Sequence, residues 1–232
     1  MLAFVAAEAR EFDGLIGRVE RVARLDWPLD FARGGWLHDQ AVVLVANGPG
    51  PKLAGRAADV VREYGKELEG LVSVGFCGAL SLALEPCDIF IANEMYDVSH
   101  ALSVPRSHSC ERYKTGKLLS MDRIAGTAEE KAALHQKTGA DAIEMEAAAL
   151  VARAQEWKIP FYAVRVVTDT ATEGFPLDFN RLRDRDGRFS RARILGAALR
   201  RPATILPALL HLNRRCKAAS RVLGDFIADT RF

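Results

Sequence analysis

Two glutamates flank a methionine in the stretch GADAIEMEAAALVARAQ, residues 139–155. Charged carboxylates are rarely fully buried unless something pairs with them, yet Glu144 and Glu146 open an apolar, alanine-rich helical pattern. Side chains two positions apart point to nearly opposite sides of a helix, so both cannot share one apolar face. We expect Glu146, directly before AAALVA, to bind something. Glu144 is either its support or a solvated first-turn acid stabilised by the helix dipole.

A second acid, Asp169, ends the apolar run FYAVRVVTD between Thr168 and Thr170, four residues after Arg165. The ligand crevice of a parallel α/β sheet lies at the carboxyl ends of its strands, so Asp169 is a candidate general acid or base. Its alternative role is to cap the next turn. Glu11 follows the first strand and could project into the same crevice, or be an ordinary solvated glutamate.

Apolar runs of strand length alternate with helical patterns along the chain, which predicts an α/β sheet covered by helices on both sides. The predicted strands are residues 2–7, 41–47, 68–75, 88–95 and 161–169, and the predicted helices are 51–64, 128–136 and 141–157.

The remaining segments are a long connection, a tail and two glycine turns. Residues 97–117 are polar and aperiodic, so we expect a functional or disordered loop, and its His100 and His108 could contact substrate or simply be solvated. The tail is predicted helical from about 190 with a break at 200–202. Gly48-Pro49-Gly50 and the turn at Gly75 are tight turns or ligand-facing backbone.

The amino-acid composition limits the classes of protein to which the chain can belong. With 49% hydrophobic and 27% charged residues, residues 1–232 indicate one soluble globular domain with a basic helical extension from about 190. Widely spaced cysteines and histidines predict no metal, no other cofactor and no disulfide framework. We find no signal-peptide pattern and no transmembrane run, and we expect a cytoplasmic location. The basic tail lacks stacking aromatics, so we expect no nucleic-acid partner.

Four segments, in order and spacing, resemble the family of purine nucleoside phosphorylases and 5'-methylthioadenosine/S-adenosylhomocysteine nucleosidases. These are VANGPGPKLAGRAA, SVGFCGALSLALEPCDIFIANEM, GADAIEMEAAALVA and IPFYAVRVVTDTA. The resemblance extends from residue 1 to about 175. It implies a three-layer α/β/α sandwich with a central mixed, twisted sheet, and a site for ribose-linked purines.

The resemblance also implies residue roles. Glu146 would accept hydrogen bonds from the ribose 2'- and 3'-hydroxyls, with Met145 against the sugar. Asp169 would protonate the purine at N7. Glu11, with Arg165, would position and activate the attacking water.

Other positions would contact the substrate. Ile124 and Ala125, in LLSMDRIAG, would lie beside the adenine, and Gly75, Phe76 and Thr168 would border the bound nucleoside.

The chain departs from the phosphorylase pattern at the second glycine turn. Ser73 and Phe76 stand where phosphorylases with a GSCGA turn carry an arginine and a serine that help to hold phosphate. Losing a cationic fork and a hydroxyl favours water over phosphate as nucleophile. Arg10 or Arg165 could still serve phosphate, which stays open as a co-substrate.

The arginine-rich tail is either a membrane-surface helix or an outer helix packed on the domain or on a second subunit. With LRRPATILPALLHL it resembles a subgroup of hopanoid-associated phosphorylases. That resemblance implies a lipid-linked nucleoside, adenosylhopane, with peripheral contact at the inner membrane, and the family implies a homodimer. The alternatives are a soluble nucleoside substrate and a non-catalytic nucleoside-binding protein.

Overall fold

The computed structural model describes residues 1–65, 67–99, 102–107, 113–184 and 186–232. Within these residues nine strands form one mixed sheet in the order β10-β6-β8-β9-β5-β1-β4-β3-β2. They are β1 (Leu2–Ala6), β2 (Glu20–Arg24), β3 (Phe31–Leu37), β4 (Gln40–Ala46), β5 (Gly70–Ala79), β6 (Ile89–Met95), β8 (Tyr113–Ser120), β9 (Ala142–Glu144) and β10 (Phe161–Asp169). A separate antiparallel pair joins β7 (Arg106–Ser107) to β11 (Thr230–Arg231).

The α-helices are α1 (Pro51–Tyr64), α2 (Ala128–Thr138), α3 (Ala147–Trp157), α4 (Arg191–Arg200) and α5 (Pro202–Ala228). Short 3₁₀ turns are η1 (Ala9–Phe12), η2 (Ile16–Arg18) and η3 (Phe179–Leu182). Residues at the N-terminal ends of α1 and α2 favour a helix start at these positions. Pro51 occupies the first turn of α1, and the Thr127 hydroxyl accepts from the Glu130 N–H to cap α2.

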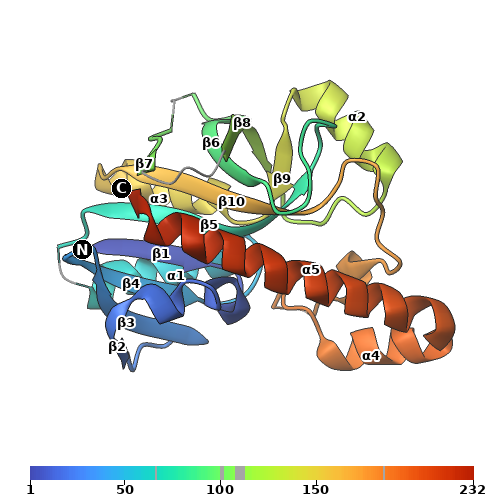
Figure 1. Ribbon diagram of the computed structural model, residues 1–232, viewed down its shortest axis with the longest axis horizontal. Coiled ribbons are helices and arrows are strands. Elements are labelled where there is room, and N and C mark those ends of the chain that lie inside the picture. Colours follow the sequence, from blue (N-terminus) through green and yellow to red (C-terminus); the bar gives the residue numbers. More distant parts are fainter. Residues whose placement is uncertain (66, 100–101, 108–112, 185) are drawn as a thin grey trace.

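Helices cover both faces of the sheet, so the expected three-layer α/β/α arrangement is confirmed (Figure 1). Alternate residues of β1 face opposite layers: Ala3 and Val5 pack towards α1 and α3, whereas Leu2 and Phe4 pack towards α5. At one end the sheet closes on itself, because β10 hydrogen-bonds with both β5 and β6.

The predicted helix over 141–157 is wrong at its start. Ala142–Glu144 form β9, which pairs with β5 and β8, and α3 begins only at Ala147. The alanine-rich pattern suits a helix, but pairing on both sides satisfies the backbone of these three residues as a strand. Glu144 therefore ends a strand, and Glu146 is the N-cap residue of α3.

The predicted loop over 97–117 is also partly wrong, because β8 begins at Tyr113 and pairs with β6 and β9. The first residues of β8 are exposed and mostly polar, so the sequence lacks the apolar run that would have predicted a strand there. His100 and His108 lie outside the described residues. The strands β2 and β3 were also absent from the sequence-based expectation.

The helical tail is confirmed, with its break at Arg201, whose φ of −142° is not helical. The second half of α5 buries Leu223, Phe226 and Ile227 against the sheet. Its first half extends beyond the strands with α4 beside it, as a helical hairpin (Figure 1). Among the described residues, no helix is both long and apolar enough to cross a bilayer.

Candidate active site

A cavity of about 550 Å³ opens where β1, β5 and β10 end, which is where ligands bind in α/β sheets. Nine residues predicted from the sequence line it: Glu11, Phe76, Ile124, Ala125, Glu144, Met145, Glu146, Thr168 and Asp169. Two others, Gly75 and Arg165, lie behind its wall. The structure thus brings together side chains that are up to 158 residues apart in the sequence (Asp169 and Glu11).

Glu11 is presented by η1, directly after β1, and is only 5% exposed. Its carboxylate accepts hydrogen bonds from the backbone N–H groups of Glu8 and Phe76, each at 2.8 Å. Gly75 leaves room for it: a Cβ there would lie 2.4 Å from Glu11 Oε1, and the φ of +140° at Gly75 also favours glycine. Burial raises the pKa of Glu11, although both backbone donors oppose the shift.

Glu146 enters the cavity from the start of α3, with Met145 beside it. Its Oε1 accepts from the backbone N–H of Gly50 at 2.8 Å, so the first glycine turn supports the acid. Burial, with the nearby Glu144 carboxylate, raises the pKa of Glu146 to about 8. Glu146 is thus a buried acid that can change its protonation state near neutral pH.

Glu144 is a support rather than a solvated acid. It accepts from the backbone N–H groups of Glu146 and Ala147, at 2.9 and 3.0 Å, and forms an ion pair with Arg165. Arg165 also donates to Ser73 Oγ at 2.5 Å. Arg165 is therefore paired with Glu144 and Ser73, and its expected role with Glu11 at an attacking water stays a prediction.

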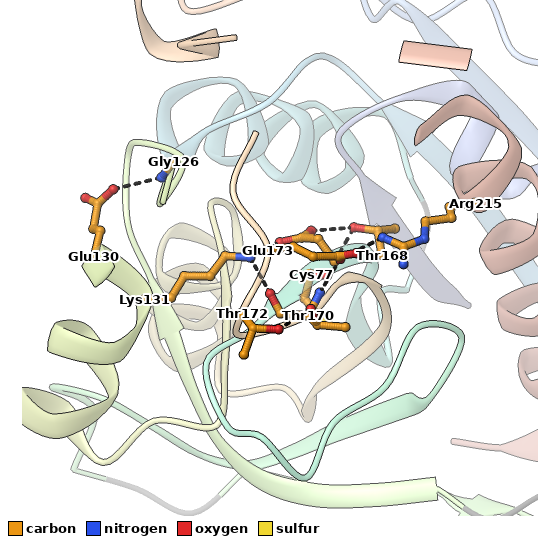
Figure 2. A network of polar contacts seen from close by, with 10 residues as sticks. Cys77, Gly126, Glu130, Lys131, Thr168, Thr170, Thr172, Glu173 and Arg215 are labelled. Atoms are coloured by element: carbon orange, nitrogen blue, oxygen red, sulfur yellow. Dashed lines mark hydrogen bonds and ion pairs between the residues drawn. The ribbon is translucent and has the colours of Figure 1, made fainter. Parts of the chain in front are cut away.

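Asp169 lies at the end of β10, where the register with β5 shifts after Val167. Lys131 Nζ donates to its Oδ2 at 2.5 Å, and Thr168 Oγ1 lies 2.9 Å from its Oδ1. Burial raises the pKa of Asp169, whereas Lys131 and Thr168 oppose the shift. Figure 2 shows Lys131, Thr168 and Thr170 converging in this network, with Glu173 and Arg215 on its other side.

The predicted base-binding residues, Ile124 and Ala125, also line the cavity. The backbone N–H and C=O of Ile124 are both held by the side-chain amide of Asn180, at 2.8 and 2.9 Å. This amide ties η3 to the segment that precedes α2, and so connects the two loops around this part of the cavity.

An apolar part of the cavity is contributed by the segment after β10 and by the helical tail. Its members are Phe175, Phe179, Phe189, Ile194, Leu209 and Leu212. The three phenylalanines contact one another edge to face, with ring centroids 5.5 and 6.1 Å apart. The tail therefore forms part of the cavity wall.

A model of the Phosphorylase superfamily matches residues 99–200. The chain is also similar to a 5'-methylthioadenosine/S-adenosylhomocysteine nucleosidase of Staphylococcus epidermidis, with 23% identity over 180 residues that cover 65% of this chain and 78% of that one. Both matches agree with the sequence motifs in pointing to a likeness to the phosphorylase superfamily.

Solved structures share the fold of this chain. The nucleosidase of Neisseria meningitidis, in complex with methylthio-immucillin-A, superposes with a TM-score of 0.71 at 20% identity and covers 98% of this chain and 96% of its own. A futalosine hydrolase mutant of Helicobacter pylori superposes with a TM-score of 0.70 at 15% identity, over 98% and 96% of the two chains.

Lys131 is the residue of the site that the sequence did not reveal. It is fully buried on α2, whose sequence AEEKAALHQKT is typical of a surface helix. Its partner Asp169 lies 38 residues away. Among the described residues, no group of three or more metal-ligating side chains is present.

Proposed function

We propose that this chain is a phosphorylase-superfamily enzyme that cleaves the N-glycosidic bond of an adenine nucleoside and releases adenine. The observation that carries the proposal is the meeting of three buried acids, Glu11, Glu146 and Asp169, around one cavity. Glycosidic cleavage passes through an oxocarbenium-like transition state, which needs an acid at the leaving group and negative charge near the sugar.

Each acid has a role that its surroundings suit. Glu146 holds the ribose hydroxyls, with Met145 against the sugar ring. Asp169 delivers a proton to N7 of the departing base, which makes the base a better leaving group. Glu11, fixed by two backbone donors, takes the proton of the attacking water.

Charge in the cavity favours water over phosphate as the nucleophile. Four acidic side chains, Glu8, Glu11, Glu144 and Glu146, line the wall, and those that are ionised would repel a phosphate dianion. Arg10 is already paired with Glu8 at 2.5 Å. Arg123, which also lines the cavity, is paired with Glu130, and Arg165 is paired with Glu144. Within the part of the chain that the structure describes, these arginines are therefore not free to form the cationic fork expected of a phosphorylase.

The apolar part of the cavity supports a substrate with a large hydrophobic group on the nucleoside. We propose adenosylhopane, a lipid-linked adenine nucleoside, as that substrate, with formation of a ribosyl hopanoid. The exposed part of the α4–α5 hairpin would contact the membrane that holds the lipid. The homodimer expected from the resemblance stays a prediction that light scattering tests.

Adenine release, measured with and without phosphate, tests these proposals. We expect release from adenosylhopane, no release from methylthioadenosine, and no dependence on phosphate. Release from methylthioadenosine alone would contradict the lipid-linked substrate and favour a soluble nucleoside. A strict need for phosphate would contradict hydrolysis. Binding of either nucleoside without any release would indicate a non-catalytic binding protein.

A further inference from the structure

Lys131 has no role in the proposed function as described so far, although it is placed at the reacting end of the cavity. Its side chain is 0% exposed, and Nζ donates both to Asp169 Oδ2 and to the carbonyl of Thr170, at 2.5 and 2.7 Å. The Phe175 ring lies 5.7 Å from Nζ. A buried ion pair is costly to desolvate and adds little net stability, so one that borders a cavity indicates a function.

The hydrogen bonds around Asp169 suit both its protonated and its ionised form. Thr168 Oγ1 lies 2.9 Å from Asp169 Oδ1 and 3.2 Å from the Cys77 carbonyl oxygen. A hydroxyl has one hydrogen and can also accept. With Asp169 ionised, Thr168 donates to the carboxylate. With Asp169 protonated on Oδ2, the oxygen that Lys131 contacts, Oδ1 is a carbonyl oxygen that still accepts from Thr168.

We propose that Lys131 supplies the proton that Asp169 passes to the departing purine, an assignment that rests on the proposed function. An N–H bond of Lys131 breaks as an O–H bond forms on Asp169. That O–H bond then breaks as the purine N7–H bond forms, while the electron pair of the C1'–N9 bond moves into the base. Lys131 is left as a neutral amine. Solvent returns its proton, which balances the proton that the attacking water gives to Glu11.

The other charged groups near Lys131 and Asp169 are bound to partners of their own. Glu173, which follows β10, pairs with Arg215 of α5 at 2.7 Å, so their charges offset each other. On α2 itself, Glu130 is bound to Arg123 and to the Gly126 N–H. Burial raises the pKa of the Cys77 thiol, which keeps it neutral. Of the charged groups named here, Lys131 is the one that donates to Asp169.

The pH dependence of adenine release tests this assignment. In the wild type, Lys131 should keep Asp169 supplied with a proton, so the rate should be maintained at alkaline pH. In Lys131→Met, Asp169 must hold the proton alone, so the alkaline limb should move to lower pH by about one unit or more. Lys131→Arg keeps the charge but cannot release a proton, and should lose about 100-fold at pH 8.

Control measurements separate this role from a structural one. Lys137→Met, at an exposed position of the same helix, should leave the profile unchanged. Circular dichroism and thermal melting check that each variant folds. The assignment to Lys131 would be overturned if the alkaline limb stayed in place or moved to higher pH in Lys131→Met, or if Lys131→Arg kept the wild-type rate. Neither result would affect the proposed function. Absence of adenine release by the wild type would overturn the proposed function, and this assignment with it.

Discussion

Arg165 and Glu144 form an ion pair in which each side chain is only 1% exposed. The pair joins β10 to the end of β9. Because Glu144 also accepts from the N–H groups of Glu146 and Ala147, the same pair fixes the start of α3. The position of Glu146 in the cavity thus depends on the pairing of Arg165 with Glu144.

Breaking this pair should destabilise the protein. Arg165→Met leaves the Glu144 carboxylate buried without its cation, so the free energy of unfolding should fall by about 3–5 kcal/mol. Urea denaturation measures the loss. Arg153 and Asp59 provide a matched pair at the surface, with side chains 37% and 51% exposed, and Arg153→Met should cost about 1 kcal/mol or less. Equal costs for the two variants would contradict the role given to Arg165.

The raised pKa of Glu146 predicts that stability falls as pH rises. In the folded protein Glu146 keeps its proton up to about 8, whereas in the unfolded chain it loses it near 4.5. Between these values the folded state binds more protons, so the free energy of unfolding should decrease with pH. Glu11 and Asp169, whose pKa values are also raised, act in the same direction.

Glu146→Gln removes the titrating group and should make this decrease shallower. Urea denaturation at several pH values between about 5 and 8 measures the slope. Glu156→Gln, at an exposed position of α3, is the control and should keep the wild-type slope. The assignment of a raised pKa to Glu146 is wrong if both variants show the same dependence as the wild type.

Removing the proposed general acid should abolish turnover. Asp169→Asn keeps the size of the side chain, and Lys131 can still donate to the amide oxygen, so we expect the protein to remain folded. Adenine release should fall by at least about 100-fold, the lower end of what general acid catalysis contributes. Asp178→Asn, at an exposed cap of η3, should retain activity. Survival of activity in Asp169→Asn would show that another group protonates the base.

The sequence predicts the buried parts of the fold well and the short paired parts poorly. Continuous apolar runs predicted β1, β4, β6 and β10, because these strands are buried by helices on both faces. The three residues of β9 have no such signature, since their strand state comes from pairing with β5 and β8. The boundary between β9 and α3 was therefore misplaced, although the acids on each side of it were found.

The site was predictable where an acid follows a strand or opens a helix, and not where a partner comes from a distant element. Asp169, Glu11 and Glu146 carry that local signal. Lys131 does not, because a lysine in a polar helix is usually solvated and nothing nearby in the sequence indicates its buried partner. Arg165 was identified from the sequence. Its partner Glu144 could be identified only from the fold, which brings β10 close to the end of β9.

The α4–α5 hairpin should bind anionic membranes. Its exposed leucines, Leu195, Leu199, Leu206 and Leu210, are between 39% and 64% exposed, and residues 187–224 contain nine Arg or Lys and no Asp or Glu. A second copy of this hairpin would bring like charges together, whereas anionic lipid headgroups would offset them.

The double variant Leu199→Ser with Leu210→Ser should weaken sedimentation of the protein with phosphatidylglycerol vesicles, and high salt should weaken it too. Leu82→Ser, at a leucine 80% exposed outside the hairpin, should bind as the wild type does. Equal binding to phosphatidylcholine vesicles, or an equal loss in Leu82→Ser, would contradict a membrane role for the hairpin.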